Sequence, residues 1–101
     1  MKKFMQAEIE WITPEDGGRK TVMPITMRYC PVIVFEQEQS GGSLWSAEIY
    51  NIEIHDRKSI AKVSFLMETA PFHLLSQGNK FSLYEGPRVV GEGIITAELV
   101  G

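Results

Sequence analysis

The chain has 101 residues, of which 44% are hydrophobic and 23% charged, as expected for one globular domain over residues 1–101. A net charge of −3 excludes a whole-molecule attraction to nucleic acid or an anionic membrane, although it allows a local basic patch. Cys30 is the only cysteine, so no intrachain disulfide can form. No apolar stretch is long enough to span a bilayer, and Gln6, Glu8 and Glu10 interrupt any signal-peptide core, so we expect a cytoplasmic protein.

Alternating patterns in the first half of the chain predict β-strands. Residues 4–12 alternate apolar and polar side chains, and turn formers follow at residues 13–18. Residues 32–35 predict the second strand, and residues 40–43 a surface turn. In residues 44–54 the apolar phase switches near Ile49 and Tyr50, which a bulge or two separate strands would explain.

The second half of the chain ends in a bent hairpin. A charged turn at residues 55–58 precedes a strand at residues 60–67, and residues 72–75 are expected to cross one end of the fold. Residues 80–95 predict a strand, a turn and a strand in which Gly91 and Gly93 indicate a bulge or bend. Five to seven strands with turns between them form a barrel or a sandwich, and a bent hairpin suits the seam of a small closed barrel.

The sequence contains no convincing catalytic set. The run Gly18-Arg19-Lys20-Thr21 lacks the earlier glycine and the following helix of a phosphate-binding loop, so no nucleotide is expected. His55 is expected in a turn and His73 beside a core segment, neither with a partnered nucleophile. One cysteine and two distant histidines do not match a metal site. We therefore expect no enzymatic activity, no cofactor and no metal.

Cys30 and the strand glutamates have structural interpretations. Because Cys30 stands before Pro31 and an apolar strand, we expect a small buried hydrophobe in preference to a nucleophile. An acid–base pair of glutamates is conceivable, but alternation assigns all four candidates to solvated strand faces: Glu8, Glu10, Glu48 and Glu53.

Two stretches resemble the third, C-terminal domain of elongation factor Tu. They are residues 7–21 (AEIEWITPEDGGRKT), followed by Tyr29-Cys30-Pro31 before a strand, and residues 81–95 (FSLYEGPRVVGEGII). Their order and spacing also agree, so the likeness covers nearly the whole chain. The resemblance implies an all-β fold, a small closed antiparallel β-barrel of about six strands, which agrees with the strands predicted from the pattern. It also implies a free-standing domain with no catalytic role and a possible place in translation.

In that family the domain packs against the nucleotide-binding domain and contacts the T stem of aminoacyl-tRNA through two turns. Carried over to this chain, the resemblance implies contacts at Gly18, Arg19, Lys20, Glu85 and Gly86. Independently of the resemblance, the sequence offers one cationic cluster, made of Arg19 and Lys20 with Arg28 and Arg88. Exposed amides and cationic side chains hold phosphate without reading bases. A solvated loop that only keeps the protein soluble is the alternative interpretation.

The chain departs from the family pattern in four respects. The family's proline-glycine-aspartate turn ahead of the middle strand appears here only as His55-Asp56-Arg57. Cys30 replaces an arginine and removes a cation, although Arg28 is close in sequence. Pro87 replaces the second glycine of the hairpin turn and stiffens it. We expect no partner domains, and a lone third domain could not act as an elongation factor.

Residues 23–27 are apolar and irregular, and in the family this segment lies where the domain meets its neighbours. They suggest an exposed docking edge, although the segment could equally tuck across one barrel end. The edge comprises Met23, Pro24, Ile25, Met27 and Tyr29. We therefore expect a non-enzymatic binding module that docks on a protein partner or forms a homodimer. The alternative is binding of tRNA or another structured RNA, and competition with elongation factor Tu for a partner follows by analogy alone.

Overall fold

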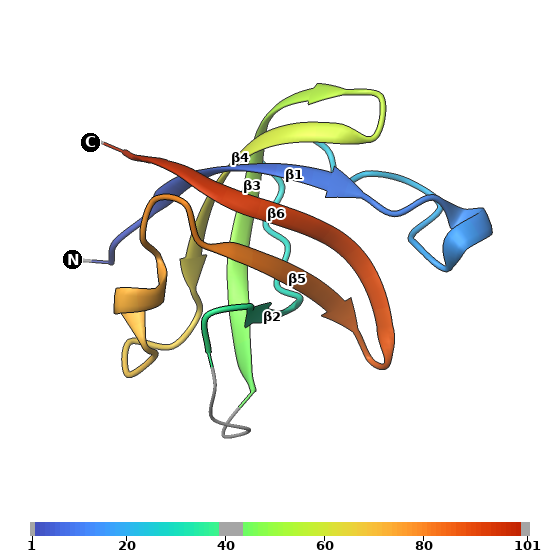
Figure 1. The fold of residues 1–101 in the computed structure, drawn as a ribbon. Helices are drawn as coiled ribbons and strands as arrows, with labels where there is room; N and C mark the ends of the chain where they lie inside the picture. The colour runs from blue at the N-terminus through green and yellow to red at the C-terminus, as the bar shows by residue number, and fades with distance from the viewer. Residues whose placement is uncertain (1, 39–43, 100–101) are drawn as a thin grey trace.

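The described residues form six antiparallel strands that close into a barrel. The structure is a computed structural model that describes residues 2–38 and 44–99. Its elements are β1 (Met5–Trp11), η1 (Pro14–Asp16), β2 (Val32–Phe35), β3 (Trp45–His55), β4 (Lys58–Phe65), η2 (Phe72–Leu74), β5 (Lys80–Glu85) and β6 (Arg88–Glu98). Around the barrel the strands follow the order β1-β4-β3-β2-β5-β6 (Figure 1). The predicted all-β class and closed barrel are confirmed, whereas the turn predicted at residues 40–43 lies outside the described residues.

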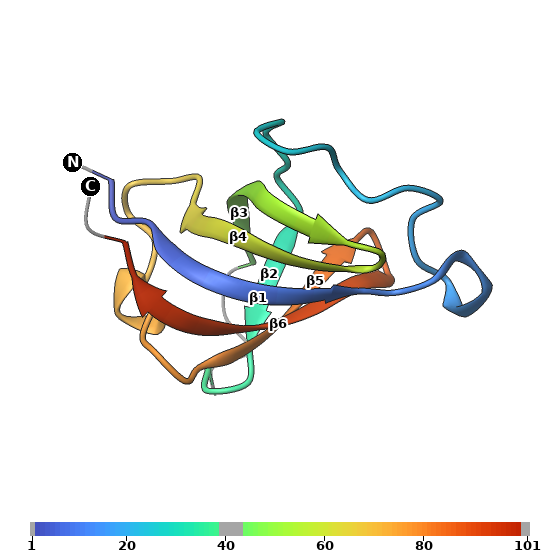
Figure 2. The same ribbon diagram turned by 90° about the horizontal axis from the view of Figure 1, so that it is seen from above.

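The first and last strands seal the barrel. β1 pairs with β6 in a register that runs from Met5 opposite Glu98 to Trp11 opposite Gly91. The other edge of β1 pairs with β4. Figures 1 and 2 both show β1 and β6 side by side. Because a closed sheet has no free edge at this seam, every backbone group of β1 can find a partner in the ladder.

Glycines on β6 allow a close approach at the closing hairpin. A Cβ atom added at Gly93 would lie 2.5 Å from Cζ of Phe81, so only glycine fits over that ring. The register between β5 and β6 shifts just after Leu83, which leaves Val90 as the extra residue of a bulge next to Gly91. The bulge predicted in this hairpin is therefore confirmed.

β3 is one continuous strand whose bulge lies further along than predicted. The inward series passes from Ile49 to Asn51, which is buried, whereas Ile52 is exposed. The register with β4 shifts between Asn51 and Glu53. The sequence placed the switch of the apolar phase near Ile49 and Tyr50, which is wrong in position. The inward face continues through Asn51, and because Asn51 is polar the apolar pattern does not show it.

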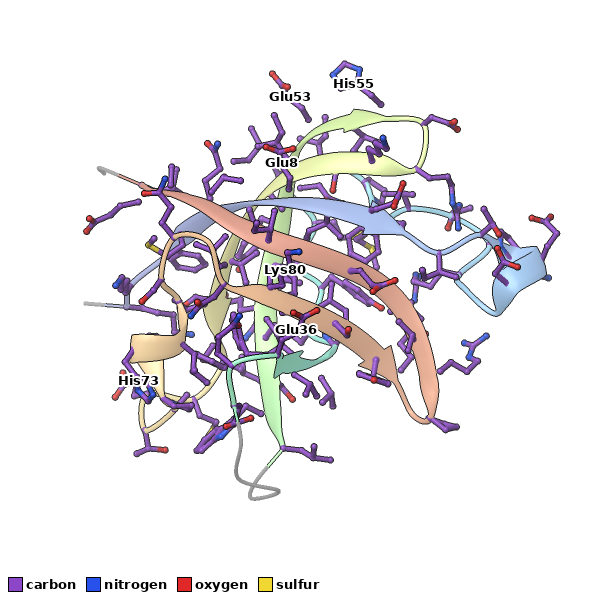
Figure 3. All side chains as sticks on the ribbon, viewed as in Figure 1. Glu8, Glu36, Glu53, His55, His73 and Lys80 are labelled. Carbon is purple, nitrogen blue, oxygen red and sulfur yellow. The ribbon has the colours of Figure 1, made fainter. Side chains whose placement is uncertain are left out.

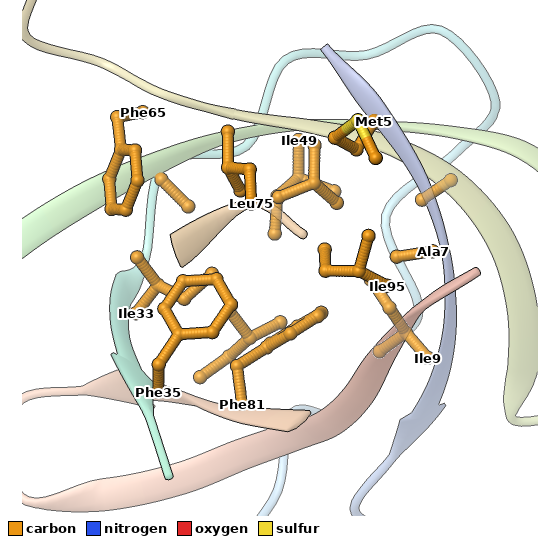
Figure 4. Packing of buried hydrophobic residues seen from close by; sticks show 14 of the residues in the cluster. Met5, Ala7, Ile9, Ile33, Phe35, Ile49, Phe65, Leu75, Phe81 and Ile95 are labelled. Atoms are coloured by element: carbon orange, nitrogen blue, oxygen red, sulfur yellow. The ribbon is translucent and has the colours of Figure 1, made fainter. Parts of the chain in front are cut away.

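Three phenylalanine rings form the centre of the core. The ring centroid of Phe35 lies 5.5 Å from that of Phe81 and 6.1 Å from that of Phe65 (Figure 4). Leu75, just after η2, is fully buried, so this segment closes one barrel end as predicted. β4 ends at Phe65, and Met67, expected within that strand, is exposed instead.

Candidate binding surface at one end of the barrel

The turn after β1 is held in one shape by the β3–β4 turn. The guanidinium of Arg57 donates from Nη2 to the carbonyls of Ile12 and Arg19, at 2.6 Å each. Gly18 is buried, and its amide donates to the carbonyl of Thr13 at 2.8 Å. A Cβ atom at Gly18 would lie 1.9 Å from the carbonyl oxygen of Ile12. The amide of Gly18 is therefore used within the turn and is not presented at the surface.

This turn meets the β5–β6 turn at a single carboxylate. The guanidinium of Arg19 and the hydroxyl of Tyr29 both donate to Oε2 of Glu85. Nη2 of Arg88 lies 3.5 Å from Oε1 of the same side chain. The Arg19 guanidinium also lies over the Tyr29 ring, 5.0 Å from its centroid. These four residues form the Glu85 cluster.

The Glu85 cluster joins two sets of residues that the sequence suggested separately. It contains part of the predicted RNA- or partner-binding set together with Tyr29, a residue of the predicted docking edge. Tyr29 itself is buried, so it supports the edge from below. Lys20 and Gly86 are exposed on the two turns beside the cluster.

Hydrogen bonds within the Glu85 cluster set its charge state. Burial alone would raise the pKa of Glu85, but hydrogen bonds from Tyr29 and Arg19 outweigh it, so this pKa lies below the ordinary value. Burial, reinforced by the hydrogen bond to Glu85, raises the pKa of the Tyr29 hydroxyl. The hydrogen bond to Glu85 raises the pKa of Arg19 against the opposing effect of burial. With Arg88 included, two guanidiniums face one carboxylate, an excess of one positive charge.

A second exposed feature at this end is the Met27 loop, residues 23–27. Ile25 and Met27 are 50% and 54% exposed, whereas Met23 is partly buried against the core. Thr26 has a φ of 66°, which is uncommon for a β-branched residue, and its amide donates to the carbonyl of Asn51 at 3.0 Å. Met23 tucks inward while the tip of the loop stays exposed, and a docking role for the exposed tip stays a prediction.

A buried chain of hydrogen bonds anchors the Met27 loop to the core. Nε1 of Trp11 donates to Oγ of Ser59 at 2.9 Å, and this hydroxyl donates to Oδ1 of Asn51 at 2.8 Å. Nδ2 of Asn51 then donates to the carbonyl of Met23 at 2.8 Å. Sequence reasoning missed this series of hydrogen bonds. The signal that could have revealed it was Asn51, a polar residue at an inward position of β3. The buried polar side chains of Trp11, Ser59 and Asn51 each have a partner in this series, which makes the loop position specific.

The expectation that Glu48 is solvated is wrong, because this side chain is only 8% exposed. Its carboxylate accepts from Nζ of Lys2 and from the Tyr50 hydroxyl, both at 2.6 Å, and Nε of Arg28 lies 3.4 Å away. Burial alone would raise the pKa of Glu48, but hydrogen bonds from Lys2 and Tyr50 bring it below the ordinary value. The other strand glutamates are exposed as predicted: Glu8, Glu10 and Glu53.

The expectation that Cys30 is buried is also wrong. Its thiol is exposed, while its neighbours Tyr29 and Pro31 point inward. The amide of Tyr29 donates to the carbonyl of Ile49 at 3.0 Å, so the segment runs along β3 with strand-like alternation. Since Tyr29 takes the inward position, Cys30 has to face outward.

A shallow groove of about 600 Å³ lies over the outer face of β1, away from these turns. Ile60 and Ile94 lie directly opposite Glu8 on the two neighbouring strands and line the groove. Glu10 faces Glu92 across the seam, and this pairing of like charges is unfavourable. The groove is therefore an open surface with mixed charge, not an enclosed cavity.

The two histidines lie far apart, as Figure 3 shows. His55 ends β3 with Nε2 3.8 Å from a carboxylate oxygen of Glu53, and His73 lies in η2. Within residues 2–38 and 44–99, no group of three or more histidine, cysteine, aspartate or glutamate residues could hold a metal ion. In the same part of the chain, no helix has the length and apolar character needed to cross a membrane. No known protein-family model matches this chain.

Proposed function

We propose that this chain is a non-enzymatic binding module that docks on a protein, or on a second copy of itself, through the barrel end that carries the Met27 loop. The observation that carries this proposal is an exposed apolar loop held rigidly in place. Ile25 and Met27 face solvent on either side of Thr26, whose left-handed backbone is maintained by the hydrogen bond to Asn51. Backbone strain of this kind persists only where the surroundings impose it, and it gathers at functional sites.

Rigidity favours binding at such a loop. An apolar side chain on a fixed support loses little conformational entropy when a partner covers it. The neighbouring turns are fixed as well, by Arg57 and by the Glu85 cluster. The proposed setting is the cytoplasm. The proposed relationship to the third domain of elongation factor Tu supports a docking role, since the family meets its neighbouring domains at this segment.

A photo-crosslinking amino acid in place of Met27 tests the proposal. The matched control carries the same amino acid in place of Leu44, which is 76% exposed and lies before β3. We expect irradiation of cells expressing the full chain to give a discrete crosslinked product from position 27 and none from position 44. Equal labelling at both positions, or none at either, would contradict a docking role for the Met27 loop.

A second candidate function is binding of tRNA or another structured RNA. It is favoured by the meeting of the two turns, where an excess positive charge lies beside the exposed Lys20. Glu85 contacts both arginines, but Arg88 is 55% exposed and Arg19 only 29%, so we expect phosphate to reach Lys20 and Arg88. We expect a Lys20→Ala, Arg88→Ala double variant to lose affinity for tRNA and to show a shallower salt dependence. Absence of tRNA binding to the unaltered chain at low salt would exclude this function.

A further inference from the structure

Ile52 extends the apolar tip of the Met27 loop onto β3. It is the extra residue of the β3 bulge, so its side chain leaves the barrel surface, and it is 42% exposed. The carbonyl of the preceding residue, Asn51, accepts the amide of Thr26, which places the loop tip beside the bulge. Ile25, Met27 and Ile52 therefore form one exposed apolar patch on two adjoining segments.

This patch has a cation on one flank and an anion on the other. Arg28 follows Met27, and its side chain is 54% exposed. Glu53 follows Ile52, and its side chain is 58% exposed. Figure 3 shows Glu53 projecting outward near the β3–β4 turn. A surface with unlike charges on its two flanks is complementary to itself, because a twofold rotation brings each flank opposite the other.

We propose that Ile25, Met27 and Ile52 form the centre of a twofold-symmetric dimer of this chain, in which Arg28 of each protomer pairs with Glu53 of the other. This inference rests on the proposed docking function and names a second copy as the partner. Burial of the apolar side chains drives association, and the two exchanged ion pairs fix the orientation. A stable interface covers roughly 800 Å² on each protomer. Because this patch has only three apolar side chains at its centre, we expect a weak dimer, with a dissociation constant in the micromolar range or above.

Sedimentation velocity of the purified full chain, from micromolar to submillimolar concentration at low salt, tests the proposal. We expect a monomer–dimer equilibrium that Met27→Asp abolishes. Ile25→Asp serves as a second variant and should have the same effect, since both positions are exposed and the barrel should still fold. Leu44→Asp is the matched control and should dimerise like the unaltered chain, because it removes an exposed apolar side chain outside the patch.

Charge exchange tests the orientation. Arg28→Glu and Glu53→Arg should each weaken the dimer by about five- to tenfold, and the double variant should regain most of this loss. Lys2→Glu controls for the loss of a cation at Glu48, which Arg28 also contacts, and should leave dimerisation unchanged. Additive effects in the double variant, or a dimer that survives Met27→Asp, would overturn the proposal.

A strict monomer at every concentration would also overturn it. The crosslinking experiment at position 27 then separates the two proposals. A crosslink to a different protein would leave the docking function intact and exclude self-pairing, whereas the absence of any crosslink would remove both.

Discussion

Arg19 and Glu85, 66 positions apart in the sequence, form an ion pair that joins the turn after β1 to the turn between β5 and β6. Tyr29 donates to the same carboxylate oxygen, so the pair also fixes the segment that leads out of the Met27 loop. The Glu85 carboxylate thus links three parts of the chain: its own turn, the turn after β1 and the segment at Tyr29.

Glu85→Gln should destabilise the protein. The substitution removes the charge that accepts from Arg19 and Tyr29, and we expect the free energy of unfolding to fall by about 1–2 kcal/mol. Urea denaturation measures the change. Glu36→Gln, at an exposed glutamate just after β2, is the control and should stay within about 0.5 kcal/mol of the unaltered chain. Equal losses in the two variants would mean that the Glu85 hydrogen bonds contribute nothing.

Stability should fall in acid through two hydrogen-bonded carboxylates, the buried Glu48 and the half-buried Glu85. Glu85 and Glu48 have folded pKa values below the ordinary value of 4.5, so each binds protons less readily in the folded state. Their contribution is therefore complete above pH 4.5 and is lost as the pH falls through the folded pKa. Urea denaturation at a series of pH values should show this decline, and a shallower one for Glu85→Gln. An equally steep decline in the unaltered chain and in Glu85→Gln would contradict a contribution from Glu85.

The strands could be predicted because each leaves a local pattern. Period-two alternation located β1 and β3, a run of branched residues located β2, and glycine marked the bend of the closing hairpin. The candidate surface was visible only as separate motifs. Arg57 could be read as part of a charged turn, but its acceptors Ile12 and Arg19 are 45 and 38 positions away. Local patterns do not specify such contacts.

The errors share one physical cause. Alternation tells which residues face the same side of a strand, but not which side is buried or what covers it. Asn51 was overlooked because the inward position holds a polar residue whose hydrogen-bond partners come from elsewhere in the chain. Glu48 was expected to be solvated from its place in the alternation, but Lys2, 46 positions away, covers it. The exposure of the Cys30 side chain depended on which way Tyr29 faces, and the sequence did not specify this.

Asn51→Leu should loosen the Met27 loop as well as the core. It leaves the Ser59 hydroxyl and the Met23 carbonyl without their buried partner, at a cost of about 2 kcal/mol. Amide exchange at Thr26, which bonds to the backbone of residue 51, should accelerate beyond this global loss. Trp11→Phe is the control, because it removes the hydrogen bond from Trp11 to Ser59 and leaves the Asn51–Met23 hydrogen bond in place. Identical exchange at Thr26 in two equally destabilised variants would argue against anchoring through Asn51.

Gly93→Ala should strain the seam of the barrel. The new Cβ atom would lie 2.5 Å from the ring of Phe81 and 2.9 Å from the carbonyl oxygen of Glu8. Phe81 packs against Phe35 and cannot retreat without disturbing the core, so we expect a loss of about 1–3 kcal/mol in thermal unfolding. Adding Phe81→Leu should relieve the ring contact, so the double variant should lose less than the sum of the two single changes. An unchanged melting temperature for Gly93→Ala alone would show that the strands are further apart here.

We expect the two turns and the Met27 loop to form one preformed surface in the free chain, and nuclear Overhauser spectroscopy measures this. The ring of Tyr29 lies 5.9 Å from that of Trp11 between centroids and 5.0 Å from the Arg19 guanidinium carbon. We predict contacts from the Tyr29 ring protons to the Trp11 ring and to the Arg19 side chain. A Tyr29 ring with contacts to neither residue would contradict a preformed surface at this end of the barrel.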